Sequence, residues 1–185
     1  MNMIETLREM FSSGQEVRVE GVLVASPSTL QLDRTSLDPD LLIEILNLYE
    51  QQDHPYTNIH SSWFVDLYYS EEVMSLVNYL IKSCQSQPKT LIVDFDPSPQ
   101  WILDTFSPYV KSIIFNLRCE LKSSPRENIV SVQIKNHHLI PQKIRSVFPN
   151  LKSLTVVTEK KKFKHTQDRL ILQFPHVEVK MVEVC

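Results

Sequence analysis

One apolar pattern recurs three times in the second half of the chain. Within residues 110–115, 129–134 and 151–156, the first, fourth and sixth positions are apolar. These positions hold Val110, Ile113 and Phe115, then Ile129, Val132 and Ile134, then Leu151, Leu154 and Val156. An apolar residue at every second position is typical of a strand that buries one face. Recurrence at a nearly constant spacing indicates a structural unit that stacks on copies of itself.

Short predicted strands alternate with predicted helices along the chain. Strands are predicted at residues 17–24, 29–33, 63–68, 90–95, 111–117, 129–135, 152–158 and 177–184. Apolar residues at helical spacing predict helices at 40–51, 71–84, 98–106, 140–148 and 170–174. Strands that alternate with helices favour parallel pairing through right-handed crossovers.

The spacing of the pattern resembles that of leucine-rich repeats. The same position of successive copies is filled by Leu91, Ile113, Val132 and Leu154, at steps of 22, 19 and 22 residues. Leucine-rich repeats are roughly 20–29 residues long, so the chain from residue 90 onward is similar to a divergent array of them. The Asn or Cys that follows each strand in that family is replaced here by Asp96, Arg118, His137 and Glu159. The resemblance therefore implies an irregular array.

A second resemblance is carried by the segment Phe-Pro-Asn-Leu-Lys-Ser-Leu at residues 148–154. Irregular arrays rich in such segments are similar to the C-terminal substrate-binding regions of F-box proteins, especially the large nematode sets. Residues 37–46 are similar to the opening helix of an F-box, whereas only Ser62 and Trp63 match its second helix. The resemblance implies an F-box-associated substrate-recognition or adaptor domain that binds a protein and is not an enzyme.

The alternation within the repeats also predicts a binding face. If helices cover the apolar positions, the intervening side chains line the opposite face of the strands. These candidate partner-binding residues are Ile114, Asn116, Ser131, Gln133, Lys135, Thr155 and Val157. Their mixture of polar and apolar groups suits a protein ligand.

The predicted fold class is α/β. It is either a short irregular leucine-rich-repeat-like solenoid or an open, mainly parallel sheet with helices. We expect a single domain over residues 1–185, in which residues 1–87 are less regular and residues 88–185 carry the strand–helix repeats.

Composition excludes several classes of function. Glycine occurs only at Gly14 and Gly21, so a glycine-rich phosphate-binding or dinucleotide-binding loop is excluded over the rest of the chain. The net charge of −3 comes from well-mixed charges and gives no general attraction to nucleic acid or membranes. No apolar run approaches the roughly 18 residues of a membrane span. Three cysteines without a C-x-x-C pair indicate a reducing, cytoplasmic or nuclear setting.

The strongest enzymatic alternative lies at residues 90–98, Thr-Leu-Ile-Val-Asp-Phe-Asp-Pro-Ser. An apolar strand ending in Asp-x-Asp-x-Ser resembles the first motif of haloacid-dehalogenase-type phosphatases. The resemblance implies Asp94 as nucleophile and Asp96 as general acid beside Mg²⁺. However, no acidic pair follows a later strand to complete the magnesium site, and Pro97 removes a backbone N–H from the loop. We therefore interpret the two aspartates as solvent-facing residues of an alternating strand and expect no metal or other cofactor.

Two other clusters suggest weaker alternatives. The basic segment from Lys160 to Lys164 contains one aromatic residue and would suit a nucleic-acid contact or a localisation signal; we interpret it as solvated surface. The neighbours His137 and His138 have no cysteine or carboxylate at metal-ligand spacing, so they predict a loop pair and not a zinc site. The expected partner is accordingly a protein, with no membrane, nucleic acid or small-molecule substrate.

Overall fold

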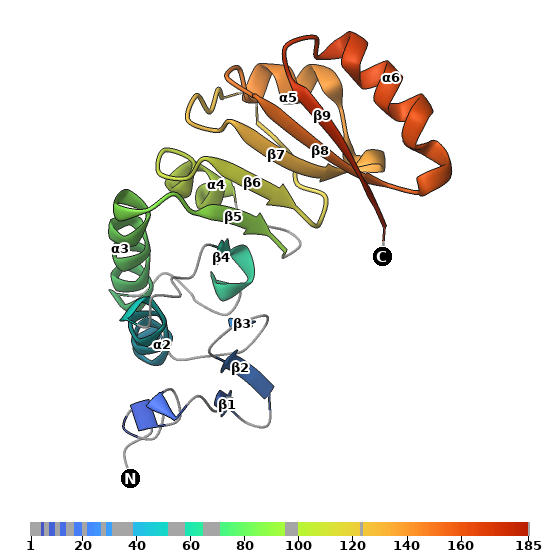
Figure 1. Ribbon diagram of the computed structural model, residues 1–185. Helices are drawn as coiled ribbons and strands as arrows, with labels where there is room; N and C mark the ends of the chain where they lie inside the picture. The colour runs from blue at the N-terminus through green and yellow to red at the C-terminus, as the bar shows by residue number, and fades with distance from the viewer. Residues whose placement is uncertain are drawn as a thin grey trace. The chain divides into compact units, whose positions relative to one another are not determined.

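The computed structural model has an α/β fold and divides into two compact units, Met1–Ser86 and Gln87–Cys185 (Figure 1). In the first unit it describes residues 5, 8, 9, 12, 13, 17–19, 22–26, 29, 30, 39–51, 58–64 and 71–86. In the second it describes residues 87–94, 100–122 and 124–184. The division between Ser86 and Gln87 lies close to residue 88, where the strand–helix repeats were predicted to begin. That the chain forms a single domain stays a prediction.

The first unit contains a small antiparallel sheet with the order β1-β2-β3. Its strands are β1 (Val17–Val19), β2 (Val22–Ser26) and β3 (Thr29–Leu30). The prediction of one strand over residues 17–24 is wrong, because Val19 pairs with Val22 and the chain reverses between them. A two-residue connection that includes Gly21 is typical of a tight hairpin, and the apolar alternation concealed that signal.

Two predicted helices of the first unit are confirmed as α2 (Pro39–Gln51) and α3 (Glu71–Ser86), which pack together. The Tyr79 hydroxyl donates a hydrogen bond to Asn47 Oδ1 at 2.7 Å and thereby joins them. The unit also contains β4 (Asn58–His60) and the 3₁₀ helix η1 (Ser61–Phe64). The strand predicted at residues 63–68 is therefore wrong over its first two residues, and its remainder lies outside the described residues.

The second unit is a parallel sheet in which the strands follow chain order (Figure 1). Its strands are β5 (Thr90–Val93), β6 (Ser112–Phe115), β7 (Ser131–Lys135), β8 (Ser153–Thr158) and β9 (Glu178–Glu183). Its helices are α4 (Gln100–Phe106), α5 (Pro141–Val147) and α6 (Phe163–Gln173), with short 3₁₀ helices η2 (Asn136–His138) and η3 (Lys160–Lys162). Each pair of neighbours from β5 to β9 is parallel, as the sequence predicted.

One face of this sheet forms the core of the second unit. A single register row joins Leu91, Ile113, Val132, Leu154 and Val179 across the five strands. The first four of these side chains are fully buried and the last is 8% exposed, which confirms the predicted core layer. Right-handed crossovers between parallel neighbours place α4, α5 and α6 on this same face. Each helix contributes buried apolar side chains to it.

A buried phenylalanine ends each of the three helical connections. Phe106, Phe148 and Phe174 are all at most 3% exposed. The carbonyl of each accepts a backbone N–H from three residues ahead, from Tyr109, Leu151 and Val177 respectively, at 2.9–3.2 Å. The recurring phenylalanine therefore fills the core and closes the turn that leads into the next strand.

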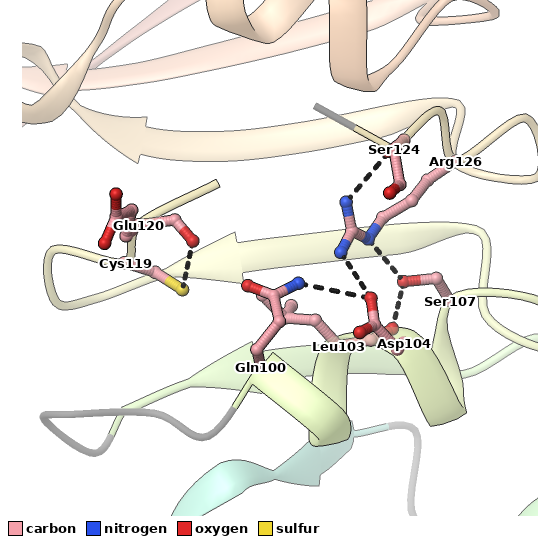
Figure 2. A network of polar contacts seen from close by, with 8 residues as sticks. All are labelled: Gln100, Leu103, Asp104, Ser107, Cys119, Glu120, Ser124 and Arg126. Atoms are coloured by element: carbon pink, nitrogen blue, oxygen red, sulfur yellow. Dashed lines mark hydrogen bonds and ion pairs between the residues drawn. The ribbon is translucent and has the colours of Figure 1, made fainter. Parts of the chain in front are cut away.

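The connection between β6 and β7 has no helix among its described residues and is held by side chains instead (Figure 2). The Arg126 guanidinium donates hydrogen bonds to Asp104 Oδ1 at 2.8 Å, Ser107 Oγ at 3.1 Å and the Ser124 carbonyl at 3.2 Å. Its backbone N–H donates to the Val147 carbonyl at 2.7 Å. Arg126 thus ties the connection to the ends of both α4 and α5.

Candidate functional site

The structure brings the predicted binding residues together on the sheet face opposite the core, which we call the open face. Ile114, Gln133 and Thr155 lie side by side in one register row. Lys135 lies beside Val157 in the next row. The other two predicted residues are Ser131, within β7, and Asn116, directly after β6.

The open face is partly solvent-exposed, in contrast to the core face of the same strands. In β6, β7 and β8, the core-facing residues are buried and the alternate residues are intermediate in exposure. Asn116 is exposed, whereas Ile92 in the neighbouring strand β5 is buried. The exposed part of the sheet therefore begins at β6.

Residues that the prediction omitted extend this surface. Ser112 and Ser153 flank Ser131 in one row, and together they form a line of three hydroxyl groups. Lys180 and Val182 in β9 continue the two rows that contain Thr155 and Val157. The alternation of residues 177–184 could have indicated that Lys180 and Val182 belong to this face. The prediction was limited to the three most regular repeats and therefore omitted them.

The open face carries two lysines, Lys135 in β7 and Lys180 in β9. Lys180 forms an ion pair with Glu178 at 3.2 Å, so these two charges offset each other. Within the part of the chain that the structure describes, Lys135 forms no ion pair. The face thus combines hydroxyl, amide and aliphatic groups with two lysines, of which Lys180 is paired with Glu178.

The phosphatase alternative depends on Asp94 and Asp96, of which the structure describes Asp94. Asp94 follows β5 directly and is partly exposed, and Asp96 lies outside the described residues. Among the described residues, no group of three or more His, Cys, Asp or Glu side chains is placed to hold a metal ion. The phosphatase interpretation remains an untested alternative.

The basic segment is partly neutralised by its own carboxylate. Glu159 pairs with Lys161 at 2.7 Å and with Lys162 at 2.9 Å. The hydrogen bonds from these two ammonium groups lower the pKa of Glu159 to about 2. All three side chains are well exposed, so solvent screens these pairs strongly. The nucleic-acid contact through Lys160 to Lys164 likewise stays untested.

The histidine pair lies at the carboxyl end of β7, in η2. The rings of His137 and His138 meet edge to face with centroids 4.0 Å apart. Nδ1 of His138 is buried and has no hydrogen-bond partner among the described residues. Burial, followed by the charges of His137, Lys135 and Arg118, lowers the pKa of His138. The imidazole is therefore neutral at pH 7.

We expect His138 to titrate below the usual histidine pKa of 6.5 in the folded protein. An NMR titration of the imidazole Cε1–H resonance measures this shift directly. The variant His137→Gln should raise the pKa of His138, because it removes the electrostatic contribution of His137 that lowers this pKa. The urea-unfolded chain provides the reference, and equal pKa values in the folded and unfolded states would contradict the placement of the ring.

Comparison with family models, with curated proteins and with solved structures found no match to this chain. Among the described residues, no helix has the length and apolar character needed to cross a membrane. The two cysteines described, Cys84 and Cys119, form no disulfide.

Proposed function

We propose that this protein is a non-enzymatic protein-interaction module and that the open face binds its partner. The supporting observation is the difference between the two faces of the sheet in the second unit. Side chains on one face are buried beneath helices, whereas their neighbours on the other remain partly exposed across β6, β7 and β8. Parallel sheets are usually covered on both faces, so an uncovered face favours a partner that completes the layer.

The finer architecture that we propose is a short, irregular leucine-rich-repeat-like solenoid. Three repeats place Ile113, Val132 and Leu154 in one core row, with a single strand per repeat. In such arrays the side chains between the core positions line an extended binding surface. An adaptor or substrate-recognition role in the cytoplasm or nucleus, as in F-box-associated domains, is consistent with this arrangement.

The chemistry of the open face favours a polypeptide segment that carries aliphatic side chains and a carboxylate. The hydroxyl row of Ser112, Ser131 and Ser153 offers donors and acceptors to polar groups of a partner. Val157 and Val182 offer apolar contact in a neighbouring row. Lys135 supplies the cation that a carboxylate would pair with.

A photo-crosslinking amino acid, p-benzoylphenylalanine, tests this face when it replaces Gln133. We expect irradiation to join the protein covalently to one defined partner in a cell extract, detected by mass spectrometry. The matched control places the same amino acid at Gln142, an exposed position of α5 on the helical side of the sheet. The same product at both positions, or none at Gln133, would contradict the proposal.

Charge changes near the probe sharpen the same experiment. Thr155→Glu should abolish the product because a carboxylate beside Gln133 would repel an acidic partner, whereas Thr155→Lys should retain it. Because the side chain at position 155 is partly exposed, either substitution should alter the free energy of unfolding by only about 0.5 kcal/mol. Changing Lys160, Lys161 and Lys162 to glutamine should leave the product intact. Loss of the product in that lysine variant would move the site to the basic segment.

A further inference from the structure

A cavity of about 620 Å³ lies at the carboxyl ends of β6 and β7, within the second unit. Its walls come from the end of β6 and the connection that follows it, from the end of β7, and from the first turn of α5. Small-molecule sites usually measure about 300–1,000 Å³, so this cavity is large enough for one small ligand. It is separate from the open face, because Phe115 and Ile134 in its wall belong to the core-facing side of their strands.

The cavity exists because the β6–β7 connection contains no helix among its described residues. In the other connections of this unit a helix packs on the core face, whereas here Leu121 reaches that layer from an irregular segment. Lys143 in α5 donates a hydrogen bond to the Leu121 carbonyl at 3.3 Å and holds that segment. Crevices beyond the carboxyl ends of parallel strands are the usual ligand sites of open α/β sheets.

The lining has an apolar interior and a cationic rim. Phe115, Leu121, Ile134 and Ile144 are all at most 7% exposed and line the interior. The rim carries Arg118, Lys122 and Lys143 against the single carboxylate of Glu120. Ile140, which is 50% exposed, adds apolar surface at the edge.

His138 gives the cavity a polar group with unused hydrogen-bonding capacity. The ring lines the cavity, and its buried Nδ1 atom has no partner among the described residues. A neutral imidazole donates one hydrogen bond and accepts another. His138 can therefore form a hydrogen bond with an oxygen of a bound acid or with a bound water molecule.

We propose that this cavity binds a small amphipathic oxyanion, a carboxylate or phosphate monoester attached to a short apolar chain. The oxyanion is held by Arg118 and Lys143 at the rim, where charge-assisted hydrogen bonds are strongest. The apolar chain lies against Phe115, Ile134 and Ile144. The sequence predicted no small-molecule ligand, because these residues come together only through the irregular connection.

Four probes separate the contributions of the ligand's oxyanion and of its apolar chain to binding. They are octanoate, octyl phosphate, 1-octanol and inorganic phosphate. Isothermal titration calorimetry with the 185-residue chain should show saturable binding of octanoate or octyl phosphate. Octanol should bind about tenfold more weakly or worse, and inorganic phosphate should show no saturable binding. Comparison of the two anions identifies which oxyanion the rim prefers. Octanol binding as tightly as both anions, or inorganic phosphate binding as tightly as octyl phosphate, would overturn the proposal.

Matched variants test the position of the ligand. The double variant Arg118→Met/Lys143→Met should weaken the binding of the anions about tenfold and leave octanol unaffected. Lys152→Met, at an exposed lysine outside the cavity, should change neither. Equal affinity in the double variant and the unchanged protein would overturn the proposal.

Cys119, which is labelled in Figure 2, provides an independent measure of occupancy. It belongs to the lining of the cavity and is partly exposed. Its alkylation by iodoacetamide, followed by peptide mass spectrometry, should slow in the presence of saturating octanoate or octyl phosphate, whichever binds. Cys84 is buried in the first unit and serves as the internal reference. If the anion binds but the alkylation of Cys119 is unchanged, the ligand lies elsewhere and the proposal is wrong.

Discussion

Replacing Leu154 with alanine should lower the free energy of unfolding by about 3 kcal/mol. Leu154 is the second residue of β8 and is fully buried, and its register neighbours are Val132 in β7 and Val179 in β9. The substitution removes apolar surface from the core and leaves a cavity that the paired strands on both sides cannot collapse to fill. Urea titration of the intact chain, followed by circular dichroism, measures the change.

The adjacent residue Thr155 is the matched control for this experiment. It belongs to the same strand but lies on the open face and is partly exposed, so Thr155→Ala should change the free energy of unfolding by only about 0.5 kcal/mol. The contrast between the two neighbours tests the direction in which β8 presents its side chains. Similar destabilisation by both substitutions would show that the open face is packed as tightly as the core.

The second unit was largely predictable because its apolar pattern has a period of two within strands and a nearly fixed spacing between them. Each of the predicted strands at residues 90–95, 111–117, 129–135 and 152–158 contains an observed strand that is shorter by one to three residues. A buried residue must occupy every second position of a half-buried strand, so a shift by one residue would expose the whole core row. The register of Ile113, Val132 and Leu154 followed from that constraint.

The first unit was less predictable because its apolar residues do not mark the chain reversals. Val17 and Val19 lie on the first strand of a hairpin and Val22 begins the second, and the valines on both sides of the turn made the segment resemble one continuous apolar strand. Trp63 and Phe64 have high strand propensity, yet they are buried in the 3₁₀ helix η1. Packing of large side chains overrides local propensity at such positions.

Helix faces and irregular connections account for the remaining differences. The apolar cluster at residues 170–174 predicted a helix, but α6 buries Leu170 and leaves Ile171 49% exposed. Arg118 and Lys122 at the rim of the cavity, and the buried Arg126, all belong to the β6–β7 connection. No periodicity governs such a segment, so the sequence alone gave no indication of which of its charged residues would become buried.

Asp104→Ala should lower the free energy of unfolding more than Arg126→Met, although the Arg126 side chain donates three hydrogen bonds and only one of them goes to Asp104. The Arg126 side chain is only 4% exposed, whereas that of Asp104 is 57% exposed. Asp104→Ala leaves a buried guanidinium without its carboxylate, which we expect to cost about 2 kcal/mol. A fully buried pair would cost about 3–5 kcal/mol, and solvent around Asp104 reduces that value.

Arg126→Met should cost only about 1 kcal/mol, because the exposed Asp104 carboxylate is then hydrated and methionine retains most of the packing. The double variant Asp104→Ala/Arg126→Met should therefore be more stable than Asp104→Ala alone, since it contains no uncompensated buried charge. Urea titrations of the three variants measure this coupling. If Arg126→Met proved the most damaging of the three, the hydrogen bonds of Arg126 to Ser107 and Ser124 would carry the stability of the connection, and its charge balance with Asp104 would be secondary.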